Sequence, residues 1–248
     1  MSGKCQLMGI ANFTDNSFLQ RSRIGQAGVM DAVRRIGMLL SEGADIVDIG
    51  ACSTAPGNAI VDADTEWSRL EPFLDAIFSS FPDAVFSFDT FRGAVLEKIL
   101  STASACRFSG QIMVNDIFSG EYDPSTIEIA VAEGLPFIAT DRTDNPYAFF
   151  GSFAAKAEKS ALKTWILDPG FGFGKTIRQN WKILEELPRL KEFGRPVLVA
   201  LSHKRMIYQR LGLTPDTCTP QSVAAEKQAI LLGADIIRTH DVSKHVSL

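Results

Sequence analysis

Residues 42–50, EGADIVDIG, contain the end of a predicted helix, a turn and a predicted strand. The helix is Ala27–Glu42, whose apolar residues recur at spacings of three and four on one stripe: Val29, Val33, Ile36 and Leu40. Gly43 follows as a candidate C-cap, because glycine readily takes the left-handed conformation that ends many helices. The largely apolar run Ile46–Gly50 is typical of a strand that is buried on both faces. The segment therefore joins a helix to a buried strand, as in an α/β fold.

The same unit recurs along the chain. The sequence LGAD at 232–235 nearly repeats residues 42–45, which we interpret as recurring turn chemistry and not as a sequence repeat. Further helical patterns cover Thr65–Phe78, Asn180–Phe193 and Gln221–Leu232, and Pro188 is expected to kink or divide the second of them. Short apolar segments that alternate with the helical ones are the predicted strands: Leu7–Ala11, Ile46–Gly50, Val85–Phe88, Ile112–Val114, Pro136–Thr140, Thr164–Leu167, Val197–Leu201 and Ile236–Arg238.

Eight strands in 248 residues predict one α/β domain over 1–248, a (β/α)8 TIM barrel, since a lone barrel takes about 250 residues. An open doubly wound sheet is the alternative for such an alternating sequence. Only Asp241–Leu248 follow the last strand, so the eighth outer helix is expected to be short or missing. A partner subunit or another part of the chain would then cover its position.

The bulk properties exclude several classes of protein. A net charge of −4 without a basic run argues against a nucleic-acid or membrane-surface partner. The four cysteines are scattered, without the spacing of a zinc site. No long apolar run follows Met1, and none approaches the roughly 18 residues of a membrane span, so a cytoplasmic protein is expected.

Polar side chains end nearly every predicted strand. In a TIM barrel the active site lies at the carboxyl ends of the strands, so these side chains are expected to converge. In chain order they are Asn12, Asp48, Asp89, Asn115, Asp116, Asp141, Asp168, Ser202 to Lys204, Arg238 and His240.

Carboxylates and amides in an apolar pocket recognise flat ligands that are rich in N–H and C=O groups. An ionised carboxylate that accepts two parallel N–H bonds from an aminopyrimidinone edge forms charge-assisted hydrogen bonds. The candidates are Asp89, Asn115 and Asp168, with Lys204 as a cationic donor. The alternative for Asp168 is a turn residue before Pro169-Gly170, and for Asp89 a helix N-cap.

Arg238 and His240 alternate on the final strand and so point the same way. Arginine is a natural partner for a diphosphate. The alternative for Arg238 is a surface ion pair with Asp235 or Asp241. His203 has less context, and His245 is expected to be exposed.

The run Gly170–Thr176 looks like a phosphate-binding P-loop but is one residue short, because Pro169 occupies the place of the first glycine. We interpret its glycines as places where the backbone approaches a ligand closely. Phe171 or Phe173 would then form an apolar wall.

Ordered motifs along most of the chain resemble the dihydropteroate synthase family. The matching segments are Met8–Thr14 with Ser17-Phe18, Glu42–Gly50 with Ser53–Gly57, Ser87–Thr90, Val114–Asp116, Leu167–Lys175, Ser202–Lys204 and Arg238–Asp241. The resemblance implies a transferase of folate biosynthesis. Such an enzyme condenses 6-hydroxymethyl-7,8-dihydropterin diphosphate with p-aminobenzoate to give dihydropteroate and diphosphate.

The resemblance also assigns roles to residues. It implies that the pterin is held by Asp89, Asn115, Asp168 and Lys204. It implies a diphosphate site at Asn12, Arg238 and His240, with Mg²⁺ near Asn12, and a p-aminobenzoate site at Thr54, Phe173 and Ser202. The expected catalytic residues are Asp89, Lys204, Arg238 and His240. The expected partners are the two substrates and a second copy of the chain in a homodimer.

The chain departs from the family at four places. Ala55 stands where the family has arginine, and His203 replaces the arginine beside the lysine. The first loop reads Thr14–Ser17 without the family's proline, and the fifth strand ends in Ala139–Arg142 where the family has a Met-His segment. Arg21, Arg23 or Arg142 could supply the missing charge.

Two other functions remain open at this point. The departures suggest a pterin-binding paralogue that has lost synthase activity. A pterin-dependent methyltransferase shares this kind of pocket, but the pair Arg238 and His240 argues against it.

Overall fold

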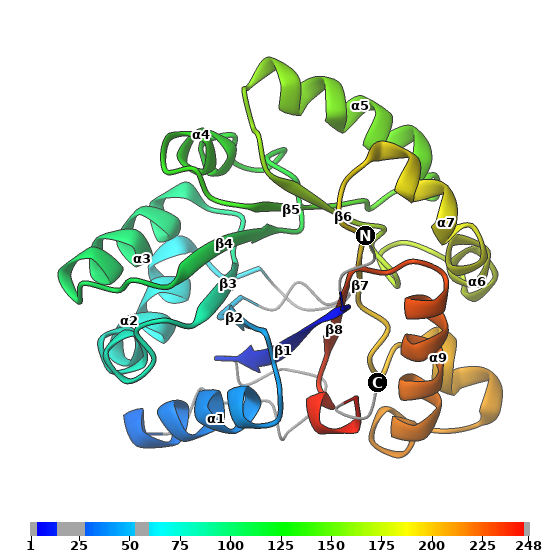
Figure 1. Cartoon of the computed structure of the whole chain (residues 1–248), viewed down its shortest axis with the longest axis horizontal. Helices are drawn as coiled ribbons and strands as arrows, with labels where there is room; N and C mark the ends of the chain where they lie inside the picture. The colour runs from blue at the N-terminus through cyan, green and yellow to red at the C-terminus, as the bar shows by residue number, and fades with distance from the viewer. Residues whose placement is uncertain (1–3, 14–27, 53–59, 246–248) are drawn as a thin grey trace.

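Eight parallel strands form a closed barrel in the computed structural model, which describes residues 4–13, 28–52 and 60–245 (Figure 1). The hydrogen-bonded order is β6-β5-β4-β3-β2-β1-β8-β7, and a parallel bridge between Leu167 and Val197 joins the two ends. The predicted TIM barrel is therefore confirmed, and the open sheet is wrong. The strands are β1 (Gln6–Asn12), β2 (Ile46–Gly50), β3 (Val85–Asp89), β4 (Gln111–Asp116), β5 (Phe137–Thr140), β6 (Trp165–Asp168), β7 (Leu198–Val199) and β8 (Ile236–Thr239).

Helices surround the barrel in alternation with the strands (Figure 1). They are α1 (Val29–Ser41), α2 (Ala63–Ser80), α3 (Gly93–Ala105), α4 (Ser125–Ala132), α5 (Pro146–Lys159), α6 (Ile177–Glu185), α7 (Leu187–Leu190), α8 (Arg205–Tyr208) and α9 (Thr219–Leu231). Short 3-10 turns are η2 (Lys191–Phe193), η3 (Gln209–Leu211), η4 (Pro215–Thr217) and η5 (Val242–Lys244). Pro188 lies in the first turn of α7, so the pattern predicted over Asn180–Phe193 is divided there.

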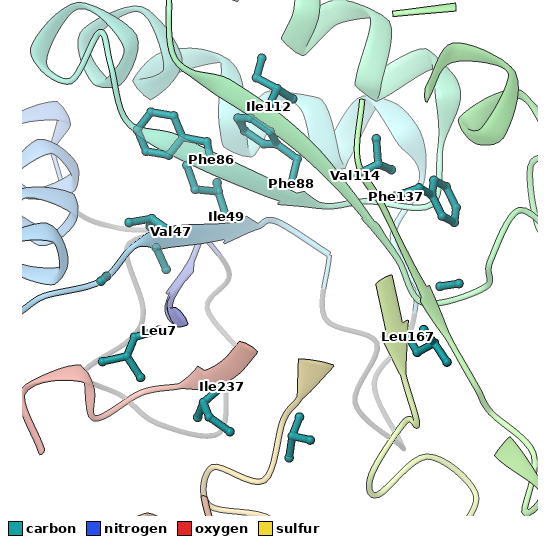
Figure 2. Close-up of a cluster of buried hydrophobic side chains, with 14 of the residues drawn as sticks. Leu7, Val47, Ile49, Phe86, Phe88, Ile112, Val114, Phe137, Leu167 and Ile237 are labelled. Carbon is teal, nitrogen blue, oxygen red and sulfur yellow. The ribbon is translucent and has the colours of Figure 1, made fainter. Parts of the chain in front are cut away.

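The hydrophobic residues form two layers, because side chains alternate between the faces of each strand. Figure 2 shows part of the outer layer, which packs between strands and helices and includes Leu7, Val47, Phe86 and Leu167. The inner layer fills the barrel: Met8, Ile46, Met113, Ile138, Ile166, Leu198, Ala200 and Ile236. Residues two positions further along share this inward face, which places Asp48, Asn115, Asp168 and Arg238 above an apolar floor.

After β8 the described residues form the short turn η5, so the prediction of a short or missing eighth outer helix is confirmed. Val242 is fully buried against β1, where a Cβ on Gly9 would lie 3.1 Å from a Val242 methyl group. His245 is only 2% exposed, and its Nε2 lies 2.8 Å from Oε2 of Glu226 on α9. The expectation that His245 is exposed is therefore wrong, because the chain folds back over the barrel after β8. Within the described ranges, no helix is both long and apolar enough to cross a membrane.

Candidate active site

A buried cluster of charged and amide groups lies inside the barrel where β2, β3, β4 and β8 end. Asp48 is fully buried, and its Oδ2 accepts from Nε of Arg238 at 2.7 Å and lies 2.6 Å from Nη2. The same Nη2 lies 3.2 Å from Oδ2 of Asp89. Nδ2 of Asn115 donates to both carboxylate oxygens of Asp48, at 3.2 and 3.3 Å. One guanidinium and one amide thus connect side chains from four strands.

The environment of Asp89 favours its protonated form. Burial raises the pKa of Asp89 to about 7, and the negative charge of Asp48 adds to the increase, while Arg238 opposes it. A carboxyl with a pKa near neutrality, next to a cation in a barrel mouth, is a common property of a functional site. The alternative of a helix N-cap at Asp89 is wrong, because α3 begins at Gly93, whose N–H donates to Asp123.

Arg238 is oriented by the buried carboxylates and not by a surface partner. Asp235 instead pairs with Lys191, and Asp241 pairs with His203. The alternative of a surface ion pair at Arg238 is therefore wrong. Burial alone would lower the pKa of Arg238, but the negative charges of Asp48 and Asp89 outweigh this effect and raise the pKa overall. The guanidinium therefore stays charged.

Asp168 ends β6, and Lys204 lies in the loop between β7 and α8. Oδ1 of Asp168 accepts from the backbone N–H of Gly170 at 2.8 Å, so the predicted turn contact exists beside any ligand role. Nζ of Lys204 donates to the carbonyl of Phe171 and lies 4.9 Å from the centre of the Phe173 ring. Burial lowers the pKa of Lys204 to about 8, although Asp168 opposes the shift. Burial also raises the pKa of Asp168.

In the glycine-rich segment Gly170–Gly174, the close approach that requires glycine is to the protein's own backbone at Asp141. A Cβ on Gly170, whose φ is +64°, would lie 1.7 Å from the carbonyl oxygen of Asp141. Lys175 is buried and donates to that carbonyl at 2.9 Å and to the carbonyl of Gly170 at 3.0 Å, so it is not available as a P-loop lysine. Phe171 is fully buried in the outer core, which leaves half-buried Phe173 as the candidate wall.

Two of the strand-end carboxylates serve loops instead of the pocket. Asp116 accepts from the N–H groups of Phe118 and Gly120, at 2.8 and 2.9 Å, and so orders the β4–α4 loop. Asp141 accepts from the N–H group of Thr143 at 2.8 Å and lies 3.4 Å from Nζ of Lys175.

The end of β7 places Ser202 and His203 differently. Oγ of Ser202 lies 3.0 Å from Nδ1 of His240 and accepts from its backbone N–H at 3.2 Å. His203 has a φ of 54°, and its Nε2 lies 2.6 Å from Asp241. Its Nδ1 lies against the carbonyl of Pro215. His203 is thus buried in contacts within the protein.

The remaining predicted residues are at the rim or outside the described ranges. Asn12 is half-buried at the end of β1, next to the strand that carries Arg238. The guanidinium of exposed Arg142 lies 4.3 Å from the centre of the Phe118 ring and, within the described ranges, forms no ion pair. Thr54, Ala55, Arg21, Arg23 and the segment Thr14–Ser17 lie outside the described residues.

One central residue had no role assigned from the sequence, although Asp48 stood among the strand-end residues. The signal that finds it is alternation: Asp48 is two residues beyond inward-facing Ile46 and is paired in register with Ser87 on β3.

Comparisons with known proteins agree with this geometry. Residues 8–240 match the family model described as pterin binding enzyme. Dihydropteroate synthase from Clostridium beijerinckii is 33% identical over 95% of this chain and 88% of its own length. The crystal structure of the Yersinia pestis dihydropteroate synthase with a sulfonamide drug complex has a TM-score of 0.86 and 32% identity, and covers 98% of this chain and 91% of that one.

A second solved structure is the Xanthomonas albilineans dihydropteroate synthase with 4-aminobenzoic acid. It has a TM-score of 0.83 and 31% identity, and it covers 98% of this chain and 90% of its own. The matches extend across the barrel and include every strand that contributes to the buried cluster. This chain therefore belongs to the dihydropteroate synthase family of pterin-binding enzymes.

Proposed function

We propose that this protein is a transferase that condenses 6-hydroxymethyl-7,8-dihydropterin diphosphate with p-aminobenzoate, forming dihydropteroate and diphosphate in folate biosynthesis. The observation that carries the proposal is the buried cluster at the barrel mouth, where Arg238 contacts Asp89 directly and is linked to Asn115 through Asp48. A flat heterocycle and a leaving anion would thus find complementary groups side by side.

The pterin would be held by Asp89, Asn115, Asp168 and Lys204. Ionised Asp89 and Asp168 accept hydrogen bonds from the N–H edge of the ring, and Lys204 donates to it. The apolar floor and the low exposure of the site strengthen these bonds, because fewer water molecules compete with them. Rigid strand ends hold the groups in place before the substrate arrives.

The diphosphate would lie at Arg238, His240 and Asn12. In the reaction, the bond between the pterin methylene carbon and the diphosphate oxygen breaks, and the amine nitrogen of p-aminobenzoate bonds to that carbon and loses a proton to solvent. Arg238 stabilises the negative charge on the leaving group, and Asp89 stabilises positive charge on the pterin.

Magnesium is part of this proposal. The amide oxygen of Asn12 is a hard ligand of the kind that Mg²⁺ accepts, and Mg²⁺ commonly binds through one or two protein oxygens together with substrate phosphates. The described residues contain no cluster of three or more His, Cys, Asp or Glu side chains suited to a metal, which fits an ion held mainly by diphosphate. Bound there, Mg²⁺ would neutralise charge on the leaving group.

The p-aminobenzoate site would include Thr54, Phe173 and Ser202. The Xanthomonas albilineans relative was solved with 4-aminobenzoic acid, which supports this substrate for the present chain. Phe173 lies half-buried beside Lys204, and Ser202 contacts His240, so both border the proposed pterin and diphosphate positions. The amine needs correct positioning more than chemical activation.

The direct test mixes the purified protein with Mg²⁺, the dihydropterin diphosphate and p-aminobenzoate. We expect dihydropteroate and diphosphate in equal amounts, loss of product when Mg²⁺ is chelated, and no product from the Arg238→Ala variant. Absence of product from the wild-type protein, despite tight pterin binding, would overturn the proposal.

A second candidate, a pterin-binding paralogue without synthase activity, is favoured by one observation. His203 stands where the family has arginine, and its two ring nitrogens contact Asp241 and the carbonyl of Pro215, so both are engaged within the protein. If Ala55→Arg converts an inactive protein into an active one, this second function is correct. The pterin-dependent methyltransferase has no such observation in its favour.

The proposal extends to the organisation of the protein. We infer one domain over residues 1–248, a homodimer, and a cytoplasmic location, since the substrates belong to central folate metabolism. Light scattering of the purified chain tests the oligomeric state.

A further inference from the structure

Asp48 lies beneath the proposed substrate site and touches two of its members. Its side chain is fully buried. Its carboxylate is within 2.7 Å of Nε and 2.6 Å of Nη2 of Arg238, and within 3.3 Å of the Asn115 amide nitrogen. The first contact is to the proposed diphosphate site and the second to the proposed pterin site.

We propose that Asp48 is a positioning residue, which aligns Asn115 for the pterin and Arg238 for the diphosphate through one shared buried carboxylate. This inference rests on the proposed function. Asp48 itself would not contact the substrate, because Arg238 and Asn115 occupy its oxygens.

The contact fixes the orientation of the Asn115 amide. An ionised carboxylate can only accept hydrogen bonds, so the NH₂ group of Asn115 must face Asp48. The amide oxygen of Asn115 is then directed away from Asp48. Asn115 would therefore accept a hydrogen bond from a pterin N–H and would not donate to a pterin carbonyl.

The contact also fixes the plane of the Arg238 guanidinium. Two of its nitrogens face Asp48, and one of these also faces Asp89. A planar guanidinium held at two nitrogens cannot rotate freely, so its remaining N–H groups have a defined direction. Without Asp48, the one ion pair left to Arg238 among the described residues would be with Asp89 at 3.2 Å.

The charge of Asp48 also acts on Asp89, the carboxylate proposed to bind the pterin. The charged groups that influence Asp89 are Asp48 on β2, Arg238 on β8, Glu66 on α2 and Asp116 on β4. Of these acids, Asp48 has the largest effect, and its negative charge raises the pKa of Asp89. Removing its charge should let Asp89 ionise at lower pH.

The test is the Asp48→Asn variant, which keeps the side-chain size and removes the charge. Binding of 6-hydroxymethylpterin is measured by calorimetry from about pH 5.5 to about pH 8.5. At the alkaline end we expect about tenfold weaker binding than in the wild type, because Asn115 is no longer held in one orientation. The midpoint of the acid limb should move to lower pH, which a purely structural role would not cause.

The matched control is Ser87→Ala. Ser87 is fully buried on β3, in register with Asp48, and its hydroxyl has no hydrogen-bond partner within the described residues. This control should leave affinity and pH midpoint as in the wild type. If Asp48→Asn does not fold, Asp48→Ser removes the same charge with a smaller side chain and should give the same shift in pH midpoint.

The outcomes separate this inference from the proposed function. If the wild-type protein binds no pterin at any pH, the proposed function fails. If the wild type binds pterin and the folded Asp48 variants show the same affinity and the same pH midpoint, the proposed function stands and the positioning role is overturned.

Discussion

The Nη2 atom of Arg238 lies 3.2 Å from Oδ2 of Asp89, so the cation proposed for the diphosphate touches the carboxylate proposed for the pterin. The guanidinium and the carboxylate, each proposed to bind a different part of the substrate, are thus held together before the substrate arrives. The arrangement lowers the cost of burying either one alone. It also makes the protonation of Asp89 depend on Arg238, with consequences for both stability and binding.

Asp89→Asn should change the pH dependence of stability and abolish tight pterin binding. The pKa of Asp89 is about 7 in the folded protein, above about 3.9 in an unfolded chain, so ionising it costs folding free energy. The stability that the protonated carboxyl allows is fully present below about pH 4 and is lost progressively as pH rises from about 4 to about 7, because the unfolded chain ionises first. We expect the stability of Asp89→Asn relative to wild type to be greater at pH 8 than at pH 5, by about 2 to 3 kcal/mol. Urea unfolding at both pH values measures this, and the same relative stability at both would contradict it.

The rate profile should be bell-shaped with a narrow maximum. Asp89 must be ionised to accept from the pterin, which sets an acid limb near its pKa of about 7. Lys204 must be protonated to donate, which sets an alkaline limb near its pKa of about 8. In Lys204→Arg the alkaline limb should disappear, because arginine stays protonated, while the maximum rate falls because a guanidinium does not match the ammonium position. Measurement of kcat/KM against pH for both proteins checks this, and an unchanged alkaline limb would remove Lys204 from the proposed donors.

The fold could be predicted from sequence because each strand–helix unit contains its own signals. The strand at Ile46–Gly50 was predicted with its observed bounds, and Gly43 and Gly233 have the positive φ values expected where a helix turns into a strand. Among the strands the differences are confined to their ends, such as β7, which is only Leu198–Val199 where Val197–Leu201 was predicted. The ends of a strand are decided by its hydrogen bonds to the strands on either side. Those bonds join distant parts of the chain, so the local sequence does not predict them.

The site could be predicted only in part, because its partnerships join distant parts of the chain. Asp89, Asn115 and Arg238 were expected to converge, and the structure brings them together. The role of Asp48 depends on β8, 190 residues further along the chain, and is invisible in local sequence. His245 was misjudged for the same reason, since its buried partner Glu226 lies on α9.

His245→Ala should destabilise the protein without affecting the site. His245 and Glu226 are both buried, and the hydrogen bond from His245 lowers the pKa of Glu226, which burial raises. Removing the imidazole leaves a buried carboxylate whose one remaining donor among the described residues is Thr239, at 3.3 Å. The expected loss is about 3 kcal/mol in the free energy of unfolding. Pterin affinity at a temperature where the variant is folded should stay at the wild-type value, because this pair lies on the outer side of β8.

The control for His245→Ala is Arg34→Ala, which breaks an ion pair with Asp31 on the exposed face of α1. Solvent screens such pairs, so this variant should unfold near the wild-type midpoint. Equal effects of the two substitutions would contradict a buried role for His245.

Gly170→Ala should disrupt the proposed pterin site, although Gly170 is not itself a proposed ligand contact. The new Cβ would lie 1.7 Å from the carbonyl oxygen of Asp141, and alanine at a φ of +64° is strained even in open space. The β6–α6 loop must then move, which breaks the bonds from Lys175 to Gly170 and from Gly170 to Asp168. We expect a loss of at least about 2 kcal/mol in stability, together with weaker pterin binding, because Asp168 loses the bond that orients it.

The control is Gly151→Ala at an exposed position of α5, where a Cβ meets nothing within 4 Å. This variant should instead gain up to about 1 kcal/mol in stability, since alanine favours helix. Thermal unfolding and calorimetry on the two variants decide the matter: if Gly170→Ala matches Gly151→Ala in both measurements, the close approach of this loop to Asp141 has no bearing on the pocket.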